Sequence, residues 1–352
     1  MMDLLITVVS FIGVLIVLVL AHECGHFFTA RAAGVRIEEF GIGFPPRLFK
    51  IKRGQTIYSL NALPLGGFVK MAGEEDPTVS GSLASKSTWV RILVLASGSV
   101  MNALLPLLLF SLSFMIPHNA MSGRVTVEEV RANSPAEAAG IVAGDTILMI
   151  NDKPVTHPVD VRRAVILKLG HEIDVLVEHS DSTRETVQMT PRWRPPEGDG
   201  AIGVLPGLSE ATTIRESYPF WEAVPMSVST CIETYIIYKN ATISMFIGTV
   251  PADIRGPVGI APIVGEAAQS GISYLLDFAA FFSVNLAIIN IFPLPALDGG
   301  RIAFVLLEWI RRGKRVSPKI EGIVHTIGFF TLMAAMLAIT YNDIIRLITG
   351  GN

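Results

Sequence analysis

The N-terminal part of the chain is a long apolar run that ends in a pair of histidines. No charged side chain occurs from Leu4 to Ala21, and the motif His22-Glu23-Cys24-Gly25-His26 follows at once. About twenty apolar residues suffice to cross a bilayer as a helix. Ionisable residues at such depth are costly and mark a functional site by default. The pattern therefore predicts a spanning helix, from about Leu4 to Ala33, that carries polar chemistry inside the membrane. Because no basic segment precedes it, we expect a retained helix rather than a signal peptide.

The histidine motif has the spacing of a zinc site. Residues four apart lie on one face of a helix, roughly 6 Å apart along its axis, which suits two ligands of one ion. Glu23 can then act as the general base that takes a proton from the attacking water. Cys24 points to another face and is not an expected ligand. The alternative is a chance match at a helix end.

The bulk composition agrees with a polytopic membrane protein. Only 17% of the 352 residues are charged, and the mean hydropathy is +0.51. The formal net charge of -3 argues against a nucleic-acid partner. Cys24 and Cys231 are the only cysteines, so we expect no disulfide framework.

Further apolar runs define the expected membrane topology. Including the first, four segments look able to span: about Leu4–Ala33, Ile92–Ile116, Tyr274–Ile291 and Ile323–Ile345. A fifth run, Trp221–Val250, carries several polar residues, so we interpret it as an amphipathic helix at the membrane surface, with a true span as the alternative.

Basic residues in the short loops indicate which ends of the helices are cytoplasmic. They place the active site within the membrane but nearer the cytoplasm, and they place the long segment from Pro117 to Gly271 outside. The loop residues are Arg31, Arg36, Arg47, Lys50, Lys52, Arg53, Lys86, Arg91, Arg301, Arg311, Arg312, Lys314, Arg315 and Lys319.

The segment from Phe40 to Ala72 is rich in glycine and proline and is not helical. Alternating residues in Arg47–Ile51 and Thr56–Leu60 predict a β-hairpin around Arg53-Gly54, and Leu65–Val69 is a third candidate strand. The sheet is either a cytoplasmic linker or an open edge beside the active site that holds an unfolded peptide by strand addition.

The segment from Gly123 to Arg192 predicts a small water-exposed α+β unit. We expect strands at Val125–Val130, Ile147–Ile150, Ile173–Val177 and Thr186–Thr190. A short helix should begin at Ser134-Pro135-Ala136, and an amphipathic helix should cover Val159–Leu169.

A zinc ion held by two histidines needs a third protein ligand. The best candidate is Asp298, because Pro293 and Pro295 end the third span and aim the backbone that follows. An aspartate there would otherwise be a costly charge or an ordinary turn residue. We expect solvated roles for His118, His157, His171 and His179, and a structural role for His325.

The motifs together resemble the site-2 protease family of intramembrane zinc metalloproteases, most closely its bacterial regulator-of-sigma-E protease branch. The similar stretches are His22–His26, Phe40–Gly43, Pro64–Met71, Gly256–Gly259 and Asn290–Gly300. The resemblance implies that His22, His26 and Asp298 bind Zn²⁺ and that Glu23 is the catalytic base. It also implies that Asn290 engages the substrate and that Phe40–Met71, with Gly66, Gly67 and Phe68, forms a re-entrant substrate-binding hairpin.

The same resemblance identifies Gly123–Arg192 as a PDZ domain of the protease type. Two features depart from the family: the length allows only one PDZ domain, and Ser99 stands where the family commonly has proline. Gly98 and Asn102 still match, and they suit either polar contact beside the metal or ordinary helix packing.

We therefore predict a polytopic α-helical membrane protein with about four transmembrane helices, a membrane-associated β-hairpin region and one inserted PDZ domain. The expected parts are residues 1–116, the PDZ domain 117–195, an interfacial segment 196–271 and a second transmembrane half 272–352. The expected activity is zinc-dependent cleavage of single-pass proteins in the bacterial inner membrane, such as trimmed anti-sigma factors and remnant signal peptides. We expect lipid as a partner, and a periplasmic PDZ domain that contacts substrate or a regulator. The alternatives are a metal transporter and an inactive PDZ scaffold, neither of which needs the base and three ligands together.

Overall fold

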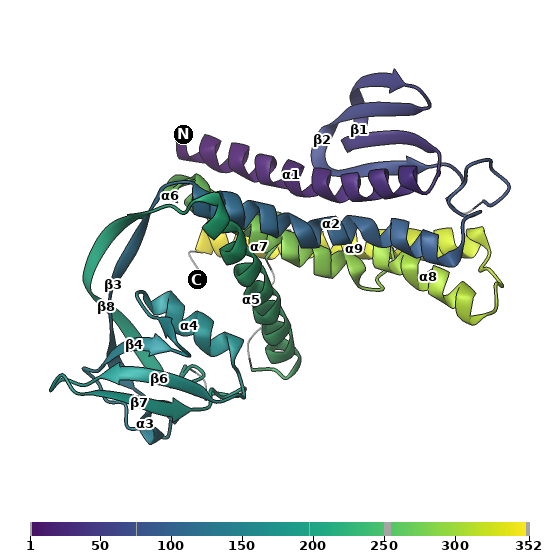
Figure 1. The fold of residues 1–352 in the computed structure, drawn as a ribbon. Coiled ribbons are helices and arrows are strands. Elements are labelled where there is room, and N and C mark those ends of the chain that lie inside the picture. Colours follow the sequence, from purple (N-terminus) through teal and green to yellow (C-terminus); the bar gives the residue numbers. More distant parts are fainter. Residues whose placement is uncertain (1, 75, 197, 250–254, 350–352) are drawn as a thin grey trace. The chain divides into compact units, whose positions relative to one another are not determined.

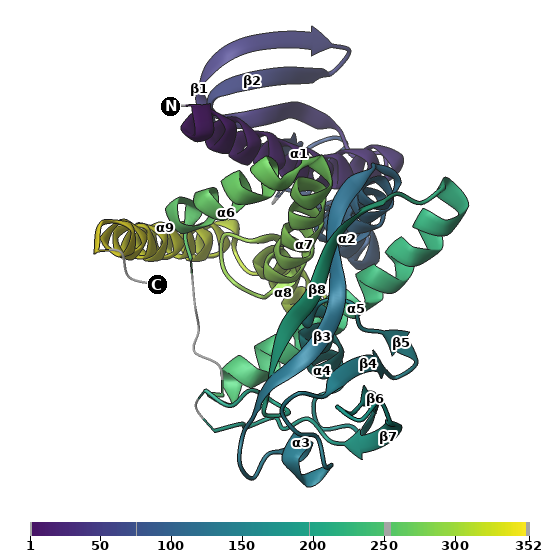
Figure 2. The same ribbon diagram turned by 90° about the vertical axis from the view of Figure 1, so that its left-hand side faces the viewer.

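A computed structural model describes residues 2–74, 76–196, 198–249 and 255–349 of the chain. These residues form two compact units (Figures 1 and 2). The first unit combines Met1–Ser113 with Ile254–Asn352, and the second is Phe114–Asp253. The second unit thus runs beyond residue 195, where the sequence placed the end of a PDZ domain.

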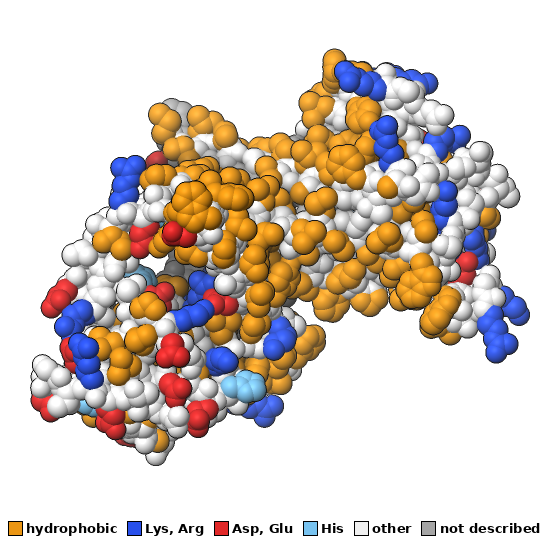
Figure 3. Space-filling model, viewed as in Figure 1, with side chains coloured by type: hydrophobic (Ala, Val, Ile, Leu, Met, Phe, Trp, Pro, Cys, Tyr) orange, Lys and Arg blue, Asp and Glu red, His pale blue; other side chains and the backbone are white. Residues whose placement is uncertain are grey.

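Helices dominate the first unit. Four of them are long and apolar enough, within the described part of the chain, to cross a membrane: α1, α2, α7 and α9. The expectation of four spanning segments is confirmed in length and composition. The helices are α1 (Met2–Ala32), α2 (Thr88–Met115), α6 (Pro257–Ser270), α7 (Ile272–Ile291), α8 (Asp298–Ile310) and α9 (Pro318–Thr349). Hydrophobic side chains cover the visible face of these helices, and basic ones gather near the β1–β2 and α8 end (Figure 3).

Helices α1 and α2 approach each other closely beside the histidine motif. A Cβ atom on Gly25 would lie only 2.3 Å from the carbonyl oxygen of Ser97, so only glycine allows this approach. Around this crossing, α1, α2, β2 and α8 contribute to one core. Its fully or nearly fully buried members include Ala30, Val94 and Val305.

The hairpin of the first unit is longer than the sequence predicted. It consists of β1 (Ile37–Arg53) and β2 (Thr56–Met71), which pair antiparallel. Ile42 on β1 faces both Leu60 and Gly67, because β2 bends and returns along the other side of β1. The expected third strand, Leu65–Val69, is therefore the second half of β2 rather than a separate element.

Two helices of this unit, α6 and α8, were absent from the sequence prediction. Helix α6 contacts α1, α7 and α9, and Figure 2 shows it between α1 and α9. The buried Asp343 of α9 accepts hydrogen bonds from the backbone N–H groups of Gly256 and Gly259, both at 2.9 Å. A carboxylate stabilises a helix N-terminus in this way, which explains how a charge is accommodated within α9.

The second unit is built on a six-stranded antiparallel sheet. Its order is β7-β6-β4-β3-β8, with β5 paired to β4. The strands are β3 (His118–Val130), β4 (Thr146–Ile150), β5 (Lys153–Pro154), β6 (Ile173–Glu178), β7 (Arg184–Met189) and β8 (Val204–Glu216), and the helices are α3 (Pro135–Ala138), α4 (Pro158–Leu167) and α5 (Phe220–Phe246). The strands expected near residues 125, 147, 173 and 186 are present, whereas β8 was not predicted.

Helix α5 packs against the sheet domain of the same unit. The side-chain amide of Asn240 donates a hydrogen bond of 2.7 Å to the carbonyl oxygen of Ile166 in α4. Glu233 forms ion pairs with Lys153 and with Arg163. Helix α5 is not among the four candidate spans of the described residues, and Val250, the expected end of this segment, lies outside them.

The second unit holds a buried carboxylate that pairs with a histidine. Asp145 is fully buried, and its Oδ1 lies 2.9 Å from Nδ1 of His179, whose Nε2 lies 3.6 Å from Glu185. The hydrogen bond with Asp145 raises the pKa of His179 above its ordinary value. The resulting stabilisation is fully present below the unfolded pKa, about 6.5, and is lost as the pH rises through the folded pKa.

We expect His179→Gln to destabilise β6 and β7 at pH 5.5 and to have a smaller effect at pH 8.5, because glutamine cannot carry the charge that pairs with Asp145. Hydrogen exchange of these strands in the intact protein measures the effect. His171→Gln, at an exposed histidine of the same unit, is the control. A His179→Gln effect that is equal at both pH values would contradict this account.

Candidate active site

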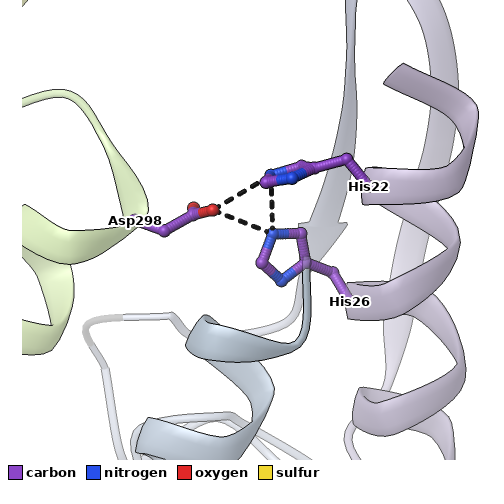
Figure 4. A group of neighbouring side chains, drawn as sticks. All are labelled: His22, His26 and Asp298. Carbon is purple, nitrogen blue, oxygen red and sulfur yellow. Dashed lines mark hydrogen bonds and ion pairs between the residues drawn. The ribbon is translucent and has the colours of Figure 1, made fainter. Parts of the chain in front are cut away.

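Three side chains from two distant segments meet beside α1. His22 and His26 project from one face of α1, and Asp298 projects from the first turn of α8 (Figure 4). Oδ2 of Asp298 lies 3.0 Å from Nε2 of His22 and 3.2 Å from Nε2 of His26, and the two Nε2 atoms are 3.2 Å apart. The structure thus brings together the three residues that the sequence singled out as ligands.

This triangle of donor atoms has the dimensions of a zinc site. A tetrahedral zinc ion with ligand bonds of roughly 2.0–2.1 Å separates its donors by about 3.3 Å. The observed separations of 3.0–3.2 Å are close to that value. Two imidazoles and one carboxylate also form a donor set typical of catalytic zinc, which leaves one position open. The residues present therefore fit this metal.

Helix α2 forms one wall of the site. A Cβ atom on Gly98 would lie 2.4 Å from Nε2 of His26 and 2.7 Å from Nε2 of His22, so any larger residue would fill the space in front of the imidazoles. Nδ1 of His26 lies 2.8 Å from the carbonyl oxygen of Val94. Nδ1 of His22 lies 3.4 Å from the side-chain amide of Asn102. In both rings Nε2 therefore faces Asp298, and Nδ1 has a polar neighbour on α2.

The carboxylate of Asp298 is placed to bind a cation together with the two histidines. Its Oδ2 faces Nε2 of both histidines, at 3.0 and 3.2 Å, so all three side chains can bind one ion. A negative charge at the first turn of α8 is also favoured by the helix dipole.

The loop before Asp298 is held by α9. Helix α7 ends at Ile291, before Pro293 and Pro295, and Ala296 adopts a left-handed backbone with φ of 74°. The N–H of Ala296 donates a hydrogen bond of 2.9 Å to Nδ1 of His325. His325 therefore has a backbone partner near the site, in keeping with the structural role expected for it.

The remaining predicted site residues line one cavity with the three ligands. This cavity has a volume of about 620 Å³. Its walls include Glu23, Asn290, Gly66, Gly67 and Phe68 together with His22, His26 and Asp298. Strand β2 runs very close to α1 here, because a Cβ atom on Gly67 would lie 2.9 Å from Cγ of Glu23. Cys24 is outside the group of potential metal ligands found among the described residues.

Sequence reasoning missed the contacts that join the hairpin to α8. Arg301, one turn after Asp298, donates a hydrogen bond of 2.7 Å to Glu74, and Glu74 accepts another of 3.0 Å from the N–H of Met71 at the end of β2. Both charged residues line the cavity that contains the three potential ligands. No local pattern marks this pair, since its members are 227 residues apart.

Comparison with known proteins identifies a family whose model matches most of the chain. The model of peptidase family M50 matches residues 10–335. A protein of Clostridium acetobutylicum provisionally named a zinc metalloprotease is 36% identical, over 94% of each chain. The regulator of sigma-W protease RasP of Bacillus subtilis is 31% identical, over 97% of this chain and 99% of its own. The zinc metalloprotease RasP of Geobacillus kaustophilus is 29% identical, over 98% of this chain and 99% of its own.

We expect His22→Ala, His26→Ala and Asp298→Asn each to weaken zinc binding by at least roughly 100-fold, because each removes or weakens one of three protein ligands. Zinc content and competition with a chromophoric chelator measure the loss in purified protein. His171→Ala, at an exposed histidine of the second unit, should keep the affinity. Full zinc occupancy in Asp298→Ala would remove Asp298 from the site.

Proposed function

The chain belongs to peptidase family M50, the site-2 protease family, and it is a zinc-dependent membrane metalloprotease, so we propose that it cleaves the spanning segments of single-pass membrane proteins. The observation that carries the proposal is the single cavity that contains Glu23, the three potential ligands and the second half of β2. A hydrolytic site next to a strand suits a peptide substrate that has been unwound.

The proposed roles of the side chains follow from their chemistry. His22, His26 and Asp298 hold zinc, which when bound polarises the scissile carbonyl and makes the attacking water more acidic. Glu23 lies between the two histidines on α1 and takes the proton of that water, then delivers it to the leaving amine. Asn290 at the end of α7 lines the same cavity, where its amide can hydrogen-bond the substrate backbone.

We assign β2 the task of holding the substrate. The amides of a helical substrate are hydrogen-bonded and shielded, so the scissile segment must be unwound before attack. The second half of β2 pairs with β1 on one side, and no strand pairs with its other side among the described residues. An extended substrate can add to this edge at Gly66, Gly67 and Phe68 through backbone hydrogen bonds.

The substrate class follows from the membrane setting. Proteins with one spanning segment, already trimmed outside, present a short chain to a buried cavity. Membrane-bound anti-sigma factors and remnant signal peptides are such substrates. The name of the Bacillus subtilis relative, regulator of sigma-W protease, supports the anti-sigma assignment.

We propose that the active site lies near the cytoplasmic side of a bacterial inner membrane. The basic residues of the short loops support this orientation. Trp89 and Trp309, whose exposed rings lie 6.4 Å apart, suit a membrane–water interface at this end of the helices, and the basic residues assign that interface to the cytoplasmic side. The second unit, which is inserted between α2 and α6, then faces the periplasm.

The second unit is proposed to be a PDZ domain that restricts access. Between α4 and the start of β8 lies a mainly apolar cavity of about 660 Å³, lined by Val165, Trp193, Val204 and Pro206 among others. Strand β8 is an end strand of the sheet, so a peptide from a substrate or regulator can pair with it. Helix α5 also lines this cavity, through Ile237 and Ala241.

Cleavage should depend on Glu23. We expect Glu23→Gln to retain zinc but to lose activity by roughly 100-fold or more, because glutamine cannot accept the proton of the attacking water. Co-expression with tagged single-pass proteins trimmed on the outer side measures cleavage. Glu172→Gln, at an exposed glutamate of the second unit, is the matched control. Undiminished cleavage by Glu23→Gln would refute the assignment of the base.

Removal of the sheet domain should relax substrate choice. His118 and Glu216 are paired across β3 and β8, so a short Gly-Ser linker can replace the residues between them. We expect the shortened protein to keep zinc and to cleave single-pass proteins with bulky outer domains that the intact protein spares. Unchanged selectivity would reject the filter, and a zinc-loaded but inactive protein would indicate an activating role instead.

A further inference from the structure

We propose that Asn102 positions His22, with its side-chain carbonyl oxygen accepting a hydrogen bond from the Nδ1–H group of that ring. The inference rests on the proposed role of His22 as a zinc ligand. It assigns to Asn102 a specific contact in place of general helix packing.

Both histidines direct Nε2 toward Oδ2 of Asp298, at 3.0 and 3.2 Å. A neutral imidazole that binds a metal through Nε2 carries its proton on Nδ1, and that N–H needs an acceptor that fixes the ring. For His26 the acceptor is the carbonyl oxygen of Val94, at 2.8 Å from Nδ1. His22 needs an equivalent acceptor.

The side chain of Asn102 is the polar group beside Nδ1 of His22. Its amide nitrogen lies 3.4 Å from that atom, while its carbonyl oxygen is buried and has no hydrogen-bond partner among the described residues. Two N–H groups facing each other form no hydrogen bond. The oxygen and nitrogen of an asparagine amide have nearly the same shape, so their assignment follows from the hydrogen bonds they can make. Exchanging the two gives Nδ1–H of His22 its acceptor.

The backbone of α2 holds Asn102 in place for this contact. Asn102 is 1% exposed, and its carbonyl oxygen in the main chain accepts a buried hydrogen bond of 2.8 Å from Oγ of Ser283 in α7. Val94, Gly98 and Asn102 are spaced four residues apart, which brings them onto one face of α2. That face supplies an acceptor for each ring and, at Gly98, the space between them.

The test compares three substitutions in the full-length protein. Asn102→Leu keeps the approximate size but removes the acceptor, and Asn102→Asp keeps an acceptor. Ser99→Ala is the matched control, because it removes from the same helix a buried hydroxyl that has no partner in the described part of the chain. The readouts are the zinc dissociation constant from chelator competition and the visible spectrum of the Co²⁺-substituted protein, which reports ligand geometry.

We expect Asn102→Leu to weaken zinc binding by roughly 10–100-fold and to alter the Co²⁺ spectrum, as loss of a partner behind a metal-bound histidine does elsewhere. Asn102→Asp and Ser99→Ala should stay within about threefold of the original affinity. Wild-type affinity and spectrum in Asn102→Leu would overturn the proposal, as would an Asn102→Asp protein as impaired as Asn102→Leu.

Measurement of His22→Ala in the same assay separates this inference from the proposed metal site. If His22→Ala loses zinc and Asn102→Leu does not, the metal site stands and the role of Asn102 is wrong. If His22→Ala also retains zinc, His22 is not a ligand, and the proposed metal site itself is wrong. Thermal unfolding in the presence of a chelator shows whether each variant keeps its fold without metal.

Discussion

The interaction on which the first unit depends is the meeting of His22, His26 and Asp298 in apolar surroundings. A charge or an imidazole at such depth is costly unless protein or metal compensates it. The chain meets this constraint by bringing α8 to α1 and by allowing α2 to approach through Gly25 and Gly98, where a Cβ atom would collide with backbone or ring atoms. The close helix packing and the donor triangle are therefore one arrangement.

Other polar groups of the spanning helices follow the same rule and join neighbouring elements. Asp343 binds the first turn of α6, and Ser283 of α7 binds the backbone of Asn102 in α2. Arg91 at the start of α2 donates a hydrogen bond of 2.6 Å to Glu308 of α8, the helix that begins with Asp298. Because apolar surfaces alone do not distinguish one helix partner from another in lipid, such polar contacts help to specify the packing.

The sequence allowed prediction of whatever depends on local pattern. Long apolar runs predicted the spans, the four-residue spacing predicted that His22 and His26 share a face, and Pro293 and Pro295 drew attention to Asp298. What it did not allow is the prediction of pairing over long distances: the paired residues of β3 and β8 run from Val130 and Val204 to His118 and Glu216, and Arg301 binds Glu74 over 227 residues. Helix α8 was also missed, because the turn residues before it masked an amphipathic segment whose partners, among them Arg91 of α2, lie far away in the sequence.

The contact between Arg301 and Glu74 connects the proposed substrate strand, β2, to α8, the helix that begins with Asp298. Arg301 lies on α8, one turn after Asp298, while Glu74 holds the N–H of Met71 at the end of the proposed substrate strand. One ion pair and one backbone hydrogen bond therefore join the proposed substrate strand to the helix that carries Asp298. Nearer the middle of β2, the backbone at Gly67 runs so close to Glu23 that a Cβ atom there would lie 2.9 Å from its Cγ. The proposed substrate edge, the base and one ligand thus share short physical connections, and seating an extended peptide on β2 would position it relative to all three.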